Sequence, residues 1–209
     1  MARTKGARNE GFEVKRTALI ATLRERLRAA GPAPSFRELA AAAEVSVPTL
    51  RHYFADRDGV VRAVMEDELA GGATPGGPLE IAATPQGAFA DSIRALLRHA
   101  DDGFRYGGLT EAHAMGLAEG LTSEGLAADY LRLALDPTID AFAARLRAHQ
   151  EAGGMRSGVD PRAAAVQLLA PLLVTRLHQD RLGGRDRIAI DMTAMLDQQA
   201  EAFVKGYEA

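Results

Sequence analysis

The strongest constraint on the fold is a pair of short helix patterns within residues 35–54. Ser35-Phe-Arg-Glu38 is a capping box, in which the serine hydroxyl accepts a hydrogen bond from the third helical amide and the glutamate accepts one from the cap amide. A second serine, Ser46, stands before Pro48, which a first helical turn tolerates because the missing N–H has no partner there. The pattern therefore predicts two short helices joined by a three-residue turn.

Two helices joined so closely must cross at a short distance, which requires small side chains at the crossing. Ala40 and Ala43 supply them. The apolar core between the helices is predicted to contain Leu39, Val45, Leu50 and Phe54. The second helix then keeps an outward face that fits the major groove of DNA, which is about 12 Å wide. The segment is thus predicted to be a helix-turn-helix.

We expect the DNA contacts to come from this segment and its neighbours. Arg51 can donate two parallel hydrogen bonds to the edge of a guanine. Hydroxyl groups such as those of Thr49 and Tyr53 suit phosphate oxygens, and Arg57, at the start of the next helix, can reach the DNA backbone. The complete predicted contact set is Ser35, Arg37, Ser46, Val47, Pro48, Thr49, Arg51, His52, Tyr53 and Arg57.

Charges are distributed unevenly along the chain. Residues 1–55 contain ten Lys/Arg and five Asp/Glu, whereas the rest contains fifteen and twenty-three, so +5 and −8 make up the net charge of −3. A basic end on an acidic body is typical of a nucleic-acid-binding module joined to another function, although chance drift is an alternative. Residues 1–11, with Arg3, Lys5 and Arg8, are expected to form a mobile basic tail.

Nearly all of the remaining sequence has helical rather than strand periodicity. The predicted fold class is therefore all-α. The Gly- and Pro-rich residues 71–78 are predicted to form a loop, and Asp136-Pro137 is expected to bend or split a long helix. Further helices are predicted near residues 12–30, 57–70, 84–99, 109–120, 123–151, 161–182 and 187–207.

Composition and motifs argue against several classes of protein. The chain has no cysteine, and its five histidines lack metal-ligand spacing, so no metal or other cofactor is expected. Neither G-x-S-x-G nor a P-loop occurs, and we expect no enzyme activity; a site assembled only by folding is the alternative. The sequence also contains no signal-peptide or membrane-helix pattern. A cytoplasmic location without a membrane partner is therefore expected.

At the helix-turn-helix the sequence resembles the TetR family of one-component regulators. The residues that carry this resemblance are Phe36-Arg-Glu-Leu-Ala40, Ala43-Glu-Val-Ser46, Thr49-Leu-Arg-His-Tyr-Phe54 and Asp56-Arg57. The match covers about residues 12–70, and the remainder is similar in helix count and length. The resemblance implies a homodimer with a DNA-binding domain at residues 1–56 and a ligand-binding and dimerisation domain at residues 57–209.

Three positions depart from the family pattern. Glu44 stands in the turn where the family usually has glycine, so it must adopt a strained φ or use a different turn. Arg51 replaces the usual tyrosine, and the base preference should differ accordingly. Arg57 replaces the usual lysine and keeps the charge.

The last two predicted helices have broad apolar faces, which the resemblance suggests pair across a two-fold axis as a four-helix bundle. The alternative is that these faces only complete the core of one protomer. The predicted interface residues are Leu169, Leu172, Leu173, Arg176, Met192, Met195, Leu196 and Phe203.

The middle helices carry polar groups inside apolar runs, a pattern typical of ligand pockets. For each such residue the alternative is an ordinary core position with a satisfied polar group. The predicted ligand-binding residues are Phe89, Tyr106, His113, Met115, Tyr130, Phe142 and Gln167.

Residues and resemblance together predict a sequence-specific transcriptional regulator, a repressor that binds a palindromic operator in double-stranded DNA and is released by a small-molecule effector. Two alternatives belong to other classes. A ligand-independent, nucleoid-type DNA-binding protein would have a DNA affinity that no metabolite changes. A small helical enzyme with an inert helix-turn-helix would show turnover without DNA affinity.

Overall fold

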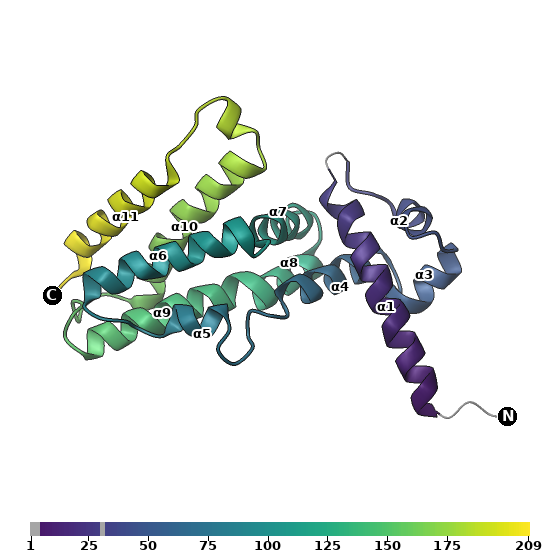
Figure 1. Ribbon diagram of the computed structural model, residues 1–209, viewed down its shortest axis with the longest axis horizontal. Helices are drawn as coiled ribbons and strands as arrows, with labels where there is room; N and C mark the ends of the chain where they lie inside the picture. Colours follow the sequence, from purple (N-terminus) through teal and green to yellow (C-terminus); the bar gives the residue numbers. More distant parts are fainter. Residues whose placement is uncertain (1–4, 30–31) are drawn as a thin grey trace. The chain divides into compact units, whose positions relative to one another are not determined.

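The computed structural model describes the backbone of residues 5–29 and 32–209, and their side chains from Gly11 onward. Within these residues the chain is helical, and an isolated bridge between Met155 and Glu208 is the only strand-like pairing. The predicted all-α fold class is confirmed (Figure 1).

The described helices alternate with short connections. Their bounds are α1 Lys5–Arg28, α2 Phe36–Ala42, α3 Val47–Phe54, α4 Arg57–Leu69, α5 Pro78–Ala83, α6 Phe89–Tyr106, α7 Leu109–Gly120, α8 Glu124–Tyr130, the π-helix η1 Leu131–Leu135, α9 Asp136–Glu151, α10 Pro161–Asp180, the 3₁₀ turn η2 Gly184–Asp186 and α11 Met192–Tyr207.

The chain divides into two compact units. The N-terminal unit consists of the chain up to Glu68 together with Met115–Asp129, and the C-terminal unit consists of Leu69–Ala114 and Tyr130–Ala209. This division differs from the predicted boundary at residue 56, because α4 and the segment 115–129 belong with the helix-turn-helix.

The N-terminal helix is longer than predicted. Residues 5–11, expected to be a mobile tail, are the first turns of α1. Gly6 and Gly11 each cost only about 1 kcal/mol relative to alanine in a helix, and the charged residues around them are good helix formers. Arg3 lies outside the described residues, so the prediction for it stays open.

Two helices begin later than predicted. The helix expected from Thr84-Pro85 begins at Phe89, because residues 78–83 form the separate helix α5 and Thr84 is its C-cap. The helix expected from residue 187 begins at Met192, where the Asp191 carboxylate accepts hydrogen bonds from the next turn. Near Asp136-Pro137, where the long helix was expected to bend or split, the π-helix η1 separates α8 from α9.

A buried arginine holds α5 in the C-terminal unit. Arg145 of α9 donates to the carbonyl oxygens of Ile81 and Ala82 at 2.6 and 2.7 Å, and to the hydroxyl and carbonyl of Ser92. Burial lowers the pKa of Arg145. These bonds satisfy a cation that would otherwise be costly to bury. They also explain why α5 ends where it does, since its last carbonyls have a partner.

The apolar core of the C-terminal unit contains most of the residues predicted to form the dimer interface. Leu169, Leu172, Leu173, Leu196 and Phe203 are all buried members of this core. Met192 and Met195 pack against it, and Arg176 is buried as well. The buried members of this set complete the core of one protomer, whereas Met192 and Met195 are half-buried; a dimer interface through these residues stays a prediction.

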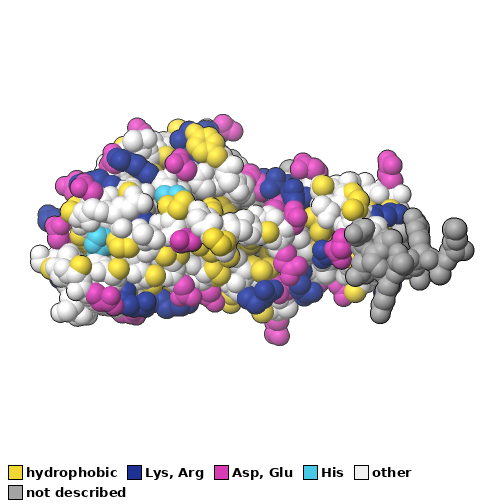
Figure 2. Space-filling view, turned by 60° about the horizontal axis from the view of Figure 1, so that its bottom comes forward, with side chains coloured by type: hydrophobic (Ala, Val, Ile, Leu, Met, Phe, Trp, Pro, Cys, Tyr) yellow, Lys and Arg dark blue, Asp and Glu magenta, His cyan; other side chains and the backbone are white. Residues whose placement is uncertain are grey.

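Charges on the surface of the C-terminal unit are mixed. On the face shown in Figure 2, acidic and basic side chains lie interspersed rather than in separate patches. The negative balance of this part of the sequence thus forms no single acidic field on that face.

Candidate nucleic-acid interface

The two helices of the helix-turn-helix begin at the predicted caps. The Ser35 hydroxyl accepts from the Glu38 amide at 3.3 Å, and the Glu38 carboxylate accepts from the Ser35 amide at 2.8 Å. The hydrogen bonds from Ser35 lower the pKa of Glu38. At α3 the Ser46 hydroxyl accepts from the Thr49 amide at 3.2 Å. The capping box and the second cap are thereby confirmed.

The turn between α2 and α3 contains a strained residue. Glu44 has a φ of 52°, in the left-handed region that glycine adopts freely. Of the two options predicted for Glu44, the structure has the strained one. The turn is closed by hydrogen bonds from the Glu44 amide to Ala41 and from the Val45 amide to Ala40, at 3.1 and 3.0 Å.

The elbow between α3 and α4 requires a glycine that the sequence reasoning did not single out. Ala55 also has a positive φ, 62°, and its amide donates to the Arg51 carbonyl. At Gly59 a Cβ atom would lie 1.9 Å from the carbonyl oxygen of Phe54. The Gly59 amide donates a hydrogen bond to the Asp56 carboxylate at 2.8 Å, so Asp56 caps α4 as predicted.

The side chains of α3 separate into a buried and an outward face. Leu50 and Phe54 are buried, as predicted. Among the predicted DNA contacts, the exposed ones are Ser35, Arg37, Ser46, Pro48, Arg51 and His52, and the half-buried ones are Val47, Thr49, Tyr53 and Arg57. The outward face is therefore polar and basic, with Arg51 near its centre.

Aromatic contacts hold the C-terminal half of α3 against α1. Phe12 stacks on Tyr53 with ring centroids 4.7 Å apart and meets the His52 ring edge-on at 5.5 Å. The Arg51 guanidinium lies over the Phe36 ring, 5.7 Å from its centroid. Beside these residues is a shallow groove of about 330 Å³, to which α1 and α4 contribute Arg16 and Arg62. Basic side chains from three helices thus adjoin at this end of α3.

Arg57 is engaged within the protein. Its guanidinium donates to both carboxylate oxygens of Glu119, at 2.7 and 2.6 Å, and to the Pro34 carbonyl at 2.8 Å. The hydrogen bonds from Glu119 raise the pKa of Arg57. In the free protein Arg57 therefore has a structural role, and its contact with the DNA backbone stays a prediction. No local pattern reveals the structural role, because the partner lies 62 residues away.

Two more polar links join α4 to the segment 115–129. The Ser123 hydroxyl donates to the Asp58 carboxylate at 2.9 Å, and Arg62 forms an ion pair with Asp129. Together with the Arg57 pair, these links explain why residues 115–129 belong to the N-terminal unit.

The residues predicted to bind a ligand are not brought together. His113 and Tyr130 are hydrogen-bonded to each other at 2.8 Å, and Phe104 stacks on the His113 ring. Burial lowers the pKa of His113 to about 4 and raises that of Tyr130 to about 12, so both side chains are neutral near pH 7. This pair is a satisfied polar contact in the core, which is the alternative stated for it.

The other predicted ligand residues are scattered. Phe89 and Phe142 are buried in the apolar core, whereas Tyr106 is 74% exposed. Gln167 is exposed and accepts a hydrogen bond from a tyrosine at the end of α11. Met115 belongs to the N-terminal unit. None of the predicted ligand residues lines the groove beside α3 or the cavity among α6, α10 and α11, and ligand binding by them stays a prediction.

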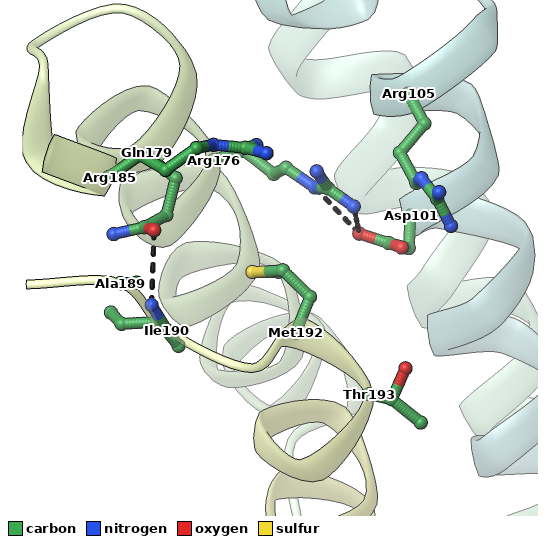
Figure 3. A pocket seen from close by; sticks show the side chains of 9 residues that line it. All are labelled: Asp101, Arg105, Arg176, Gln179, Arg185, Ala189, Ile190, Met192 and Thr193. Carbon is green, nitrogen blue, oxygen red and sulfur yellow. Dashed lines mark hydrogen bonds and ion pairs between the residues drawn. The ribbon is translucent and has the colours of Figure 1, made fainter.

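A cavity that the sequence reasoning missed lies elsewhere in the C-terminal unit. It has a volume of about 420 Å³ and lies among α6, α10, the α10–α11 connection and the start of α11 (Figure 3). Arg176 and Met192, predicted for the dimer interface, are among the residues that line it. Its lining comes from segments far apart in sequence, so no local motif marks it.

Two negative findings concern the described part of the chain. There, no group of three or more His, Asp or Glu side chains is arranged to hold a metal ion. Likewise, none of the helices over residues 5–29 and 32–209 combines the length and the apolar character needed to cross a membrane.

Solved structures of bacterial regulators have the same fold. A Mesorhizobium loti protein assigned to the TetR family aligns with a TM-score of 0.71 at 18% identity, covering 99% of this chain and 100% of its own. SmeT of Stenotrophomonas maltophilia, the repressor of a multidrug efflux pump, aligns at 0.63 with 19% identity, over 95% and 90%. FadR of Bacillus subtilis, solved with stearoyl-CoA, aligns at 0.65 with 14% identity, over 91% and 98%.

No protein-family model and no curated protein sequence matches the chain. The likeness to the solved structures therefore concerns the fold, and it extends over both compact units. The fold expected from the helix-turn-helix residues is confirmed: this chain has the fold of the TetR-family transcriptional regulators.

Proposed function

We propose that the protein is a sequence-specific DNA-binding regulator that binds a palindromic operator as a homodimer. The observation that carries this proposal is the outward face of α3. That helix is capped at Ser46, anchored by the buried Leu50 and Phe54, and presents Pro48 and Arg51 to solvent. A short helix of this kind enters the major groove with its exposed side chains toward the base edges.

Arg51 is the residue that we propose reads a base. Among the described residues it has no carboxylate partner, and its guanidinium rests only on the Phe36 ring. A guanidinium that forms no ion pair in the free protein loses none when it donates two hydrogen bonds to guanine. The hydroxyls of Ser46 and Thr49, 2.7 Å apart, are suitable donors to a phosphate.

The second face of α10 supports a homodimer. Val166, Ala170 and Val174 are exposed on this helix and follow one another at four-residue intervals, so they lie on one face. Val166 is 43% and Val174 is 64% exposed. A dimer formed through this face would supply two reading helices, which a palindrome needs about 34–36 Å apart.

We further propose that the regulator is a repressor released by a small molecule, acting in the cytoplasm where its DNA partner is. Support comes from the fold shared with the repressor SmeT and with FadR, which was solved with stearoyl-CoA. The chain passes between the two units after Glu68, Ala114 and Asp129. A change in the C-terminal unit can thus reach the segment 115–129, which is linked to α4. A coupling free energy of about 1–3 kcal/mol is typical of such regulation.

Selection from a random duplex library tests this proposal. Purified protein is incubated with the library at about 0.15 M salt, because DNA affinity depends on salt concentration. We expect an enriched palindrome with two half-sites. Weak, salt-sensitive binding without enrichment, persisting after unfolding, dialysis and refolding to remove a bound effector, would instead identify a non-specific DNA-binding protein. Absence of DNA binding would contradict the proposal altogether.

A further inference from the structure

The cavity between α6 and α10 is rich in arginine. Arg105 lies on α6, Arg176 on α10 and Arg185 in η2, and all three line the same space (Figure 3). The cavity volume of about 420 Å³ falls within the range of ordinary small-molecule sites, about 300–1,000 Å³. Three cations around one cavity of this size require an explanation.

Carboxylates within the protein neutralise only part of this charge. Arg176 is 4% exposed and donates through Nε to Asp101 at 2.7 Å, and Asp180 receives one hydrogen bond from Arg176 and one from Arg185. Asp191, next to two lining residues, directs its carboxylate at the amides of α11. Asp101 and Asp180 therefore pair with only two of the three guanidinium groups, and the cluster formed by these five side chains carries a net charge of +1.

Arg105 is the cation without a carboxylate. Within the described residues its guanidinium contacts the Tyr106 ring, 5.0 Å from the centroid, and forms no ion pair. In Figure 3, Arg105 and Arg185 stand on either side of the Arg176–Asp101 pair. The Thr193 hydroxyl also lines the cavity and can donate a hydrogen bond. The cavity is thus lined by several hydrogen-bond donors.

The wall that carries Arg185 is built into the fold. Gln179, which is 5% exposed, donates to the Ile188 carbonyl at 3.0 Å and accepts from the Ile190 amide at 3.1 Å. Gly184 lies so close to the His178 ring that a Cβ atom would come within 2.3 Å of it. These contacts fix the α10–α11 connection against α10, so the cavity is formed before any ligand arrives.

Three of the other lining residues, Ala189, Ile190 and Met192, have apolar side chains. A ligand that satisfies both kinds of lining carries an anionic group and a short apolar body. Because the net charge of the cluster is +1, a monoanionic carboxylate balances it, whereas a phosphate dianion would exceed it.

We infer that this cavity binds the carboxylate of a small organic acid with an apolar body, and that such an acid is the effector. The effector role rests on the function proposed above, whereas binding itself does not. The planar guanidinium groups of Arg105 and Arg185 would each offer paired donors to the carboxylate.

The test is a binding measurement on the full chain with defined probes. Hexanoate and benzoate are compared with their neutral amides and with inorganic phosphate by saturation-transfer NMR and equilibrium dialysis. The variants are Arg105→Gln and Arg185→Gln, which remove exposed guanidinium groups. Arg147→Gln is the matched control, because Arg147 is exposed on α9 and does not line the cavity.

We expect at least one carboxylate to bind and its amide not to bind. Loss of a charge-assisted hydrogen bond should weaken binding about tenfold or more in each cavity variant and leave the control unchanged. Arg105→Lys keeps the positive charge but lacks the paired donors of a guanidinium group. Its carboxylate affinity should therefore lie between those of Arg105→Gln and the unsubstituted protein. Equal binding of acid and amide, unchanged binding by both cavity variants, tighter binding of phosphate, or no carboxylate binding at about 10 mM would each overturn the inference.

The same preparations separate this inference from the proposed function. If carboxylates bind but DNA does not, the inference that the cavity binds a carboxylate is supported and the proposed function fails. If a palindrome is bound and no carboxylate is, only the cavity inference fails. If both bind and the carboxylate leaves DNA affinity unchanged, the effector role is overturned.

Discussion

Arg57 of α4 and Glu119 of α7 form a two-pronged ion pair, with donor–acceptor distances of 2.7 and 2.6 Å. Both side chains are largely shielded, at 24% and 10% exposed. The pair thereby joins α4 to a residue of α7 that lies 62 positions later in the sequence. The pair thus links α4, directly after α3, to α7 within the N-terminal unit.

Removing one partner of this ion pair should destabilise the protein. Glu119→Gln leaves the Arg57 guanidinium without its carboxylate, and we expect the free energy of unfolding to fall by about 1–3 kcal/mol, since the pair is only partly buried. Urea denaturation measures the change, with the exposed Glu124→Gln as control. Arg57→Ala should destabilise similarly while keeping the salt dependence of DNA binding. If the DNA affinity of Arg57→Ala depended less on salt concentration than that of the unsubstituted protein, Arg57 would be a DNA contact after all.

Base reading by Arg51 predicts a selective loss of affinity. Arg51→Ala should cost about 1–3 kcal/mol at the selected operator and relax the preference at one base position. Fluorescence anisotropy with operator variants measures both effects, and Arg147→Ala serves as a charge-matched control. A loss that is equal for all sequences would assign Arg51 to the phosphate backbone.

The strained turn offers a stabilising substitution. Glu44→Gly should raise the free energy of unfolding by about 0.5–1 kcal/mol, because relief of the left-handed strain outweighs the extra freedom of glycine in the unfolded chain. Glu44→Ala keeps the Cβ atom and should give no such gain. Thermal and urea unfolding measure the stability of the two variants. An equal gain in both would show that relief of the strained φ is not the cause.

His113 makes stability depend on pH. Its pKa is about 4 in the folded protein because of burial, whereas an unfolded histidine has a pKa near 6.5, so the unfolded chain binds more protons between these values. The contribution of neutral, buried His113 to the free energy of unfolding should be complete above about pH 6.5. It should fall by about 2 kcal/mol from pH 7 to pH 5. His113→Gln should reduce the pH dependence of urea unfolding by that amount. Tyr130→Phe should retain it, since burial rather than the hydrogen bond lowers the pKa.

The exposed face of α10 predicts a variant that fails to dimerise. Val174→Asp places a charge in the proposed interface and should yield a folded monomer, because Val174 is 64% exposed in the protomer. Sedimentation equilibrium and circular dichroism measure assembly and folding. Leu121→Asp, at a residue that is 85% exposed on the turn after α7, is the control and should remain dimeric. A dimer that survives Val174→Asp would place the interface elsewhere.

Local signals in the sequence account for the parts that were predicted well. The caps at Ser35 and Ser46 act within three residues, and they determine where α2 and α3 begin. The helix α5 was missed because the hydrogen bonds that complete its last turn come from Arg145, on another helix.

The proposed interface and the cavity depend on tertiary packing, which the periodicity of the sequence does not reveal. Both faces of α10 are apolar, and only the packing of α6, α9 and α11 decides that Leu172 lies inside while Val174 lies outside. Similarly, Arg105 and Arg185 are 80 positions apart and become neighbours only when α6 meets the α10–α11 connection.

The N-terminal unit contains two separate segments of the chain, and this limits how the helix-turn-helix can be exchanged between proteins. A fragment that stops at Glu68 would lack Glu119, Ser123 and Asp129, and would leave three polar groups of α4 without their partners. Chimaeras that join this helix-turn-helix to a different C-terminal unit would therefore need residues 115–129 transferred along with it. The N-terminal unit is discontinuous in sequence, and its two segments have to be transferred together.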